Sequence, residues 1–242
     1  MDSRVPEIRK HLKKKLDAYR YEHTLGVEFT CQALAMRYGY DLDKADLAGL
    51  LHDSAKRFED PVMLQKCLDR NSPVTAEEER DPSLLHAKLG AWMAEHKYGV
   101  DDPEILSAII CHTTGKPGMS LLDKILYVAD YIEPRRSKAA NLTAMRKLAF
   151  IDLDEACLEI MESILVYLKS TGCQIDPMTE AACEDMRRVV SERKKETAGE
   201  ASAVTGITHQ DKEEQSVESV KRNGKTCSRG FGREKRRRRK NY

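Results

Sequence analysis

Histidine and aspartate residues recur along the chain in apolar segments typical of helices: His23, His52, Asp53, His86, His112 and Asp130. A polar or charged side chain in such a segment is costly unless it has a partner. Imidazole and carboxylate groups together suit divalent iron, manganese and related ions. A metal bound by them can generate hydroxide from water near neutral pH and can polarise a phosphoryl oxygen. The set therefore predicts a metal-dependent hydrolase of phosphorylated compounds.

The adjacent pair His52-Asp53 follows two leucines at the end of an apolar segment. Adjacent residues on a helix point about 100° apart, so both side chains reach one ion only with some local distortion. Alternatively, the aspartate bridges two ions. His23 and Asp130 lie on segments that can form helices beside the pair. The sequence leaves one ion or two as open alternatives.

Helices must position these residues, because apolar side chains recur with helical spacing throughout the first 195 residues. The expected helices are 5–19, 21–38, 43–52, 61–68, 83–99, 104–112, 121–132, 151–170 and 177–195. Asp43, Ser83 and Ser120 are expected N-caps, and Asp102 is a cap followed by proline. No segment alternates with a period of two, so we expect an all-α single domain, a bundle of about ten helices over residues 1–195.

Residues 196–242 lack an apolar stripe and are rich in Ala, Gly, Ser, Thr, Glu and Gln. Such a segment buries too little surface to offset its chain entropy, so we expect a disordered tail. Residues 221–242 hold eleven Lys or Arg and one Glu, which leaves 30 basic and 39 acidic residues in 1–220. The tail is therefore basic from residue 221, at net +10, and the body is acidic, at net −9. This tail has either no specific partner or a weak contact with RNA or an anionic surface.

The composition also indicates a cellular compartment. No apolar run is long enough to span a bilayer and the charged N-terminus is not a signal peptide, so we expect a cytoplasmic protein. The chain has seven cysteines without a C-x-x-C pair. We interpret them as small buried hydrophobic residues in a reducing compartment, not as disulfides or a zinc site. The oligomeric state is left open.

Five local motifs surround the histidines and aspartates, and together they carry a resemblance. They are RYEHTLGV at 20–27, LHDSAK at 51–56, HAKLGA at 86–91, IICHTTG at 109–115 and DKILYVADYIEPRR at 123–136. This set resembles the HD-domain superfamily of metal-dependent phosphohydrolases. Within it, the set is similar to the YqeK family of symmetrical diadenosine-tetraphosphate hydrolases. The resemblance covers about residues 5–190 and not the basic tail.

The resemblance implies an iron-dependent cleavage of diadenosine tetraphosphate into two ADP, with manganese or another divalent transition metal as the alternative ion. It implies metal ligation by His23, His52, Asp53 and Asp130, with Asp53 also catalytic. His86 and His112 are implied to face the phosphates or to hold a second ion, and are candidate catalytic residues. The substrate contacts that it implies or that the residue types favour are His23, Asp53, His86, His112, Thr113, Thr114, Gly115, Arg135, Arg136, Cys173, Gln174, Ile175, Asp176, Pro177 and Met178.

The residue types agree with a polyphosphate substrate, whose negative charges must be neutralised as the bridging oxygen leaves. Lys56 follows the His-Asp pair by about one helical turn and can lie on the same face, so it is a candidate catalytic cation. Arg135 and Arg136 offer guanidinium groups that match phosphate oxygens. The hydroxyl and backbone N–H groups of 113–115 lie in an expected loop and can also take a phosphate.

Two other functions remain as alternatives. The first is another HD-type nucleotide phosphohydrolase that acts on monophosphates; the two arginines beyond the metal favour a longer polyphosphate, but weakly. The second is a nucleotide-sensing or RNA-associated module with a vestigial metal site. The complete set of ligand residues argues against a vestigial site, whereas the basic tail favours some added interaction.

Overall fold

The computed structural model describes residues 2–173 and 175–220, with side chains as far as residue 198, and these residues form helices and no strands. The helices are α1 (Val5–Lys15), α2 (Ala18–Tyr38), α3 (Leu42–Leu51), α4 (Asp60–Leu68), α5 (Ala76–Arg80), the 3-10 turn η1 (Pro82–Leu84), α6 (Leu85–Tyr98), α7 (Pro103–Cys111), α8 (Leu121–Ile132), α9 (Leu142–Leu148), α10 (Leu153–Thr171) and α11 (Pro177–Val220). The predicted all-α class is confirmed.

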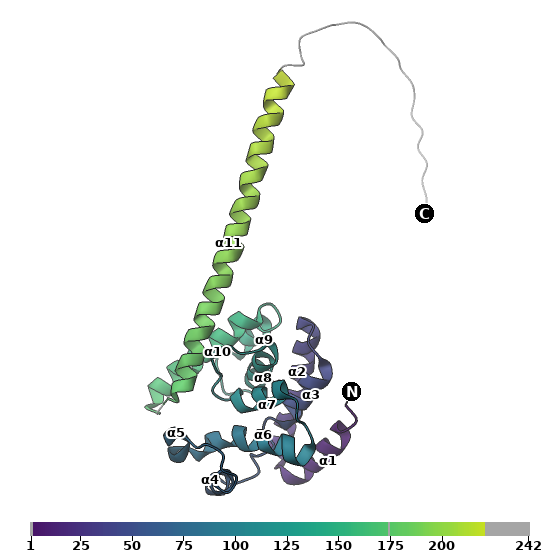
Figure 1. Cartoon of the computed structure of the whole chain (residues 1–242), viewed down its shortest axis with the longest axis vertical. Helices are drawn as coiled ribbons and strands as arrows, with labels where there is room; N and C mark the ends of the chain where they lie inside the picture. Colours follow the sequence, from purple (N-terminus) through teal and green to yellow (C-terminus); the bar gives the residue numbers. More distant parts are fainter. Residues whose placement is uncertain (1, 174, 221–242) are drawn as a thin grey trace, which may run out of the picture. The chain divides into compact units, whose positions relative to one another are not determined.

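The chain divides into two compact units, Met1–Glu192 and Arg193–Tyr242. In the first unit α3 packs against α2, α7 and α8, and α8 also packs against α2 and α7, with α6 on α7 and α10 on α8 (Figure 1). Fully buried leucines and isoleucines fill the space between these helices, among them Leu34, Leu50, Ile109, Leu126 and Ile160. This close packing fixes the helix ends from which the candidate site residues project.

Several helix ends follow the sequence signals. Ser120 accepts a hydrogen bond from the backbone of Asp123 in a reciprocal capping box, and the Asp102 side chain caps α7 ahead of its proline. Gly39 and Gly172 end α2 and α10 in the left-handed conformation. The caps at Ser120 and Asp102 were predicted and are confirmed.

Two expected caps are wrong, and one expected helix is shorter. Asp41, not Asp43, caps α3, since its carboxylate accepts from the backbone N–H of Asp43. Ser83 lies inside the 3-10 turn, where Asp81 caps its N–H, so it does not cap α6. The first helix ends at Lys15, because Asp17 already caps α2. In each case several polar residues compete locally, and the aspartate that accepts from a free backbone N–H determines the start. The short helices α5 and α9 were not predicted.

The last helix is longer than expected. The sequence predicts an end near Lys195, whereas the backbone of α11 continues to Val220. No proline occurs after Pro177, and Ala, Glu, Lys and Gln are frequent up to Val220, so local propensity alone favours continuation. The prediction of disorder rested on the missing apolar stripe, which concerns packing and not backbone conformation. The basic segment 221–242 lies outside the described residues.

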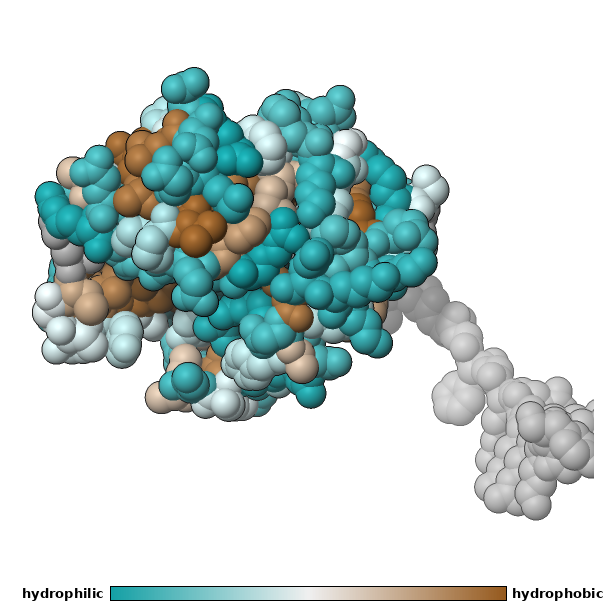
Figure 2. Space-filling model, turned by 90° about the horizontal axis from the view of Figure 1, so that it is seen from below, coloured by the Kyte–Doolittle hydropathy of each residue, from teal (hydrophilic) through white to brown (hydrophobic). Residues whose placement is uncertain are grey.

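The surface and the cysteines bear on the other expectations. No helix within the described residues has both the length and the apolar character needed to cross a membrane. The face seen in Figure 2 is mostly hydrophilic, with apolar residues in separate small patches. The described cysteines are free thiols, and all but the exposed Cys173 are buried: Cys31, Cys67, Cys111, Cys157 and Cys183. Their interpretation as small buried hydrophobic residues is confirmed for those five.

Truncation after Lys195 is expected to leave the melting temperature nearly unchanged, because residues 196–242 carry no apolar face to pack. The same truncation should abolish any salt-sensitive binding to RNA, since the net +10 of 221–242 is removed. Thermal denaturation and RNA binding at two salt concentrations, on the full and shortened chains, measure both effects. A large fall in melting temperature, or RNA affinity that survives truncation, would contradict the prediction.

Candidate metal centre

The structure brings the six histidine and aspartate residues together from five helices. Their positions are His23 on α2, His52 and Asp53 at the end of α3, His86 in the first turn of α6, His112 at the end of α7 and Asp130 on α8. Five of them are buried, with at most 4% of each residue's surface exposed, and Asp130 is partly exposed. Residues more than 100 positions apart in the chain thus meet at one place.

Asp53 stands at the centre, and its two carboxylate oxygens face different histidines. Oδ2 lies 3.8 Å from Nε2 of His23 and 3.5 Å from Nε2 of His52. Oδ1 lies 3.4 Å from Nε2 of His86 and 3.9 Å from Nε2 of His112. The cluster therefore has two halves that share one carboxylate.

Asp130 completes the first half. Its Oδ1 lies 3.0 Å from Nε2 of His23 and 3.9 Å from Nε2 of His52. The first half consequently offers two imidazole nitrogens and two carboxylate oxygens, a set that divalent transition metals accept.

In the second half, Nε2 of His86 and Nε2 of His112 lie 3.1 Å apart. The hydroxyl of Thr113 is 3.3 Å from both nitrogens. With Asp53 Oδ1, this half offers two imidazole nitrogens and one carboxylate oxygen beside a hydroxyl.

The same tautomer holds for all four imidazoles. Each Nδ1 faces an acceptor: Glu133 Oε1 at 3.1 Å for His23, Gly49 O at 2.7 Å for His52, Ser83 O at 2.5 Å for His86 and Ile109 O at 2.7 Å for His112. A backbone carbonyl or carboxylate oxygen can only accept, so each Nδ1 carries the proton and donates. In its neutral form, each ring directs the lone pair of its Nε2 toward the centre of the cluster.

These lone pairs fit a bound cation. Nε2 of His23 and of His52 are buried without a hydrogen-bond partner, and those of His86 and His112 face each other. Burial and the neighbouring His112 lower the pKa of His86 to about 3, so this ring is neutral near pH 7. Buried acceptors without donors are costly, and a divalent cation would satisfy them together.

Two arginines contact the carboxylates, and a lysine lies nearby. Nη1 of Arg20 lies 2.6 Å from Oδ2 of Asp53, and Nη2 of Arg136 lies 2.9 Å from Oδ1 of Asp130. Lys56 is half-buried, with Nζ 3.4 Å from the carbonyl oxygen of Ser83, and burial lowers the pKa of Lys56. These positive charges attract anions that carry several negative charges to this end of the fold.

Arg135 lies differently from its neighbour. Its side chain is 55% exposed, and the guanidinium pairs with Glu22, away from the central carboxylates. Its backbone N–H, in contrast, donates to Oε2 of Glu133 at 2.7 Å, so the residue contributes to the cluster through its backbone.

Glu133 and Arg20 are parts of the cluster that the sequence did not assign. The buried Glu133 accepts a hydrogen bond from Nδ1 of His23, although 110 positions separate the two residues. Gly26 leaves the space for it, because a Cβ on Gly26 would lie 2.5 Å from Glu133 Oε2. For Arg20 a signal existed: it precedes His23 by three positions, which places both on one face of α2.

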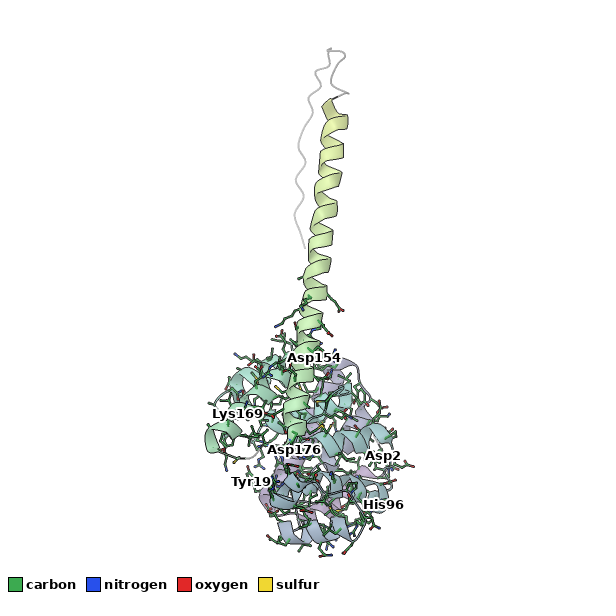
Figure 3. All side chains as sticks on the ribbon, turned by 60° about the vertical axis from the view of Figure 1, so that its left-hand side comes forward. Asp2, Tyr19, His96, Asp154, Lys169 and Asp176 are labelled. Carbon is green, nitrogen blue, oxygen red and sulfur yellow. The ribbon has the colours of Figure 1, made fainter. Side chains whose placement is uncertain are left out.

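A cavity of about 380 Å³ opens beside the cluster. We call it the Cys173 cavity; its lining includes His112, Thr113, Asp130, Arg136, Cys173 and Asp176. A second space of about 420 Å³, the Met178 cavity, shares the threonines and Asp176 and adds Gly115 and Met178. Figure 3 shows Asp176 at the start of α11.

The expected substrate-binding segment is thus brought partly to these cavities. Cys173, Asp176 and Met178 line them. Ile175 packs against the hydrophobic core, Pro177 begins α11, and Gln174 lies outside the described residues.

Comparison with known proteins finds the HD domain over residues 20–135, a range that contains all six cluster residues. The symmetrical bis(5'-nucleosyl)-tetraphosphatase of Bacillus subtilis is 39% identical over 168 residues, 69% of this chain and 89% of that protein. The Staphylococcus aureus protein of the same name is 32% identical over 166 residues, 68% of this chain and 84% of its own length.

A solved structure from Clostridium acetobutylicum is similar in fold. It is described as a predicted HD superfamily hydrolase involved in NAD metabolism. It shares 36% sequence identity and a TM-score of 0.73, over 76% of this chain and 96% of that one.

Proposed function

The chain belongs to the HD-domain family of symmetrical bis(5'-nucleosyl)-tetraphosphatases, and from this we propose that it hydrolyses diadenosine tetraphosphate to two ADP with a divalent metal. The observation that carries the proposal is the cluster of four Nε2 lone pairs around Asp53, beside a cavity lined by Arg136. These groups suit a metal and a polyphosphate at the same place.

We infer that His23, His52, Asp53 and Asp130 would hold one ion. His86, His112 and the other oxygen of Asp53 would supply ligand atoms for a second ion. The separate direction of the two Asp53 oxygens supports this arrangement. A bound metal supplies a Lewis acid and a water of lowered pKa.

The chain's own residues then bind and orient the tetraphosphate. Lys56 and Arg136 neutralise phosphate charge, and the Thr113 hydroxyl donates to a phosphate oxygen. Water attacks an inner phosphorus in this arrangement, the central bridging P–O bond breaks, and the bridging oxygen leaves on the second diphosphate. Both products are ADP. The leaving diphosphate is stable as an anion, so its bridging oxygen needs no strong acid to protonate it as the P–O bond breaks.

The cleavage pattern tests this function. Hydrolysis in ¹⁸O-labelled water should give ADP as the nucleotide product, with one label in half of the ADP molecules, as measured by mass spectrometry. AMP together with ATP would mean asymmetric cleavage and would contradict the proposal. Inorganic phosphate from a nucleoside monophosphate, with no reaction on the tetraphosphate, would favour another HD-type phosphohydrolase. Nucleotide or RNA binding without turnover would favour the sensing module.

Lys56 provides a test of phosphate binding that is separate from the metal. Lys56→Ala is expected to lower kcat/KM about tenfold, a loss of about 1.4 kcal/mol of transition-state stabilisation. Metal content should stay intact, because the ammonium contacts the carbonyl of Ser83 and no histidine or aspartate of the cluster. Arg136 is less suited to this test, since it hydrogen-bonds Asp130. Loss of metal in the Lys56 variant would instead make this residue a support of the metal centre.

We propose iron as the metal and the cytoplasm as the location. Iron is one of the ions that mixed imidazole and carboxylate ligands suit, and five buried free thiols agree with a reducing compartment. Anaerobic purification followed by metal analysis and reconstitution with iron or manganese decides the identity of the ion.

A further inference from the structure

A third cavity, of about 800 Å³, lies along α10 and has Arg136 but neither threonine of the site in its lining. We call it the Tyr167 cavity. Its lining includes Tyr131, Arg136, Lys138, Glu159, Ser163 and Tyr167.

This cavity adjoins the Cys173 cavity, which is lined by cluster residues. The Tyr167 cavity and the Cys173 cavity share Tyr131, Arg136 and Ile164. Arg136 also donates to Asp130, so the junction between the two cavities lies at the site itself. On α10, Ile164 forms the boundary: residues 160 and 168, one turn away on each side, line the first cavity, and 159, 163 and 167 line the second.

The lining of the Tyr167 cavity suits a nucleoside with a phosphate attached. Tyr167 is 64% exposed, and an exposed tyrosine ring offers a face on which a base can stack. Lys138 makes no ion pair with the described part of the chain and can pair with a phosphate oxygen. The carboxylate of Glu159 can accept hydrogen bonds from ribose hydroxyls, as acidic residues do in dinucleotide sites.

The Met178 cavity is a weaker candidate for the same ligand. Its two lysines are already paired, Lys88 with Glu78 at 2.8 Å and Lys116 with Asp123 at 2.9 Å. Among the residues that the structure describes, none with an aromatic side chain lines it. It also shares Asp176 and the threonines with the Cys173 cavity, so it lies on the same side of the cluster.

We propose that the Tyr167 cavity binds the second nucleoside of a dinucleoside tetraphosphate, while the Cys173 cavity takes the first. Tyr167 stacks on the base, Glu159 binds the ribose, and Lys138 with Arg136 follows the phosphates toward the cluster. The inference rests on the proposed function, and it makes the site a recogniser of two nucleosides on opposite sides of the central phosphates. A substrate with a single nucleoside needs only the Cys173 cavity.

The test compares diadenosine tetraphosphate with adenosine 5'-tetraphosphate, which lacks the second nucleoside. In the metal-loaded full chain, Tyr167→Ala should raise KM for the dinucleotide about tenfold, within the range expected for loss of one base–aromatic stack. KM for adenosine tetraphosphate and kcat for both should change less than about twofold, which is the scale of an indirect effect. Lys138→Ala should weaken the dinucleotide a few-fold, and less so at high salt.

Tyr19→Ala is the matched control, because Tyr19 is 67% exposed on α2, lines none of these cavities, and is labelled in Figure 3. It should leave both substrates unaffected. An equal KM change for the two substrates in the Tyr167 variant, or no change for either, would overturn the second nucleoside site. Failure of the unaltered protein to convert the dinucleotide to ADP would instead overturn the proposed function.

Discussion

Asp53→Ala is expected to remove bound metal and to lower turnover of diadenosine tetraphosphate at least ~10²-fold. Loss of a group that only supports a metal ligand costs about 10–100-fold, and loss of a ligand should cost at least as much. The reason is that each oxygen of Asp53 faces a different pair of histidines. No neighbouring side chain can replace both contacts. Metal content per chain and steady-state rates on the same preparation measure the two losses together.

Asp53→Asn and Asp46→Asn sharpen this test. The first keeps the volume of the side chain but replaces one carboxylate oxygen with an amide NH2, which cannot ligate a metal and donates to a histidine lone pair that would otherwise bind it. The second removes a carboxylate that is equally buried, with 2% exposed, but lies beside Arg9 and Gln32. Metal and turnover should be lost in the first variant and retained in the second. Retention of metal and near-normal rates in the Asp53 variants would contradict the assignment of the centre.

The ligand types could be predicted from the sequence because each one is marked locally. His52 and Asp53 end an apolar segment. His86 and His112 lie in apolar segments, where a histidine is costly unless its ring has a polar partner or a ligand. That they converge depends on packing of α2, α3, α7 and α8, which the motifs signal only as a set. The all-α class likewise follows from helical spacing, which is present in nearly every segment.

The groups that orient the ligands could not be predicted in the same way. The bond from His23 to Glu133 joins two helices 110 positions apart, and nothing in either local sequence specifies the partner. Arg135 and Arg136 are adjacent residues of the same type, but only Arg136 reaches Asp130. Which of two adjacent side chains faces a site depends on the exact exit of the chain from α8, and sequence spacing does not fix that exit.

Glu133→Gln is the second large effect that we expect, with a loss of about 10–100-fold in metal affinity or activity. The two carboxylate oxygens of Glu133 have separate tasks, since Oε1 accepts from His23 Nδ1 at 3.1 Å and Oε2 accepts from the backbone N–H of Arg135 at 2.7 Å. An amide has one acceptor oxygen and cannot serve both donors. His23 then loses its orientation or the turn after α8 loses its anchor.

Gly26→Ala tests the same contact from the opposite helix. On an open helix face this substitution would add about 1 kcal/mol of stability through helix propensity. Here the new methyl would lie 2.5 Å from Oε2 of Glu133, so the carboxylate must move and the bond to His23 must lengthen. We therefore expect metal affinity, measured by competition with a chelator, to fall about 10–100-fold despite the better helix former.

The double variant decides whether the two residues act through one contact. If both substitutions disturb the orientation of His23, the second one should add little to the first, and the losses in metal affinity should be far from additive. Additive losses would mean that Gly26 serves packing alone and that Glu133 acts by another route. Unchanged metal affinity in Glu133→Gln would show that the bond to Nδ1 does not set the tautomer of His23, and the argument for four inward-facing lone pairs would lose one of its members.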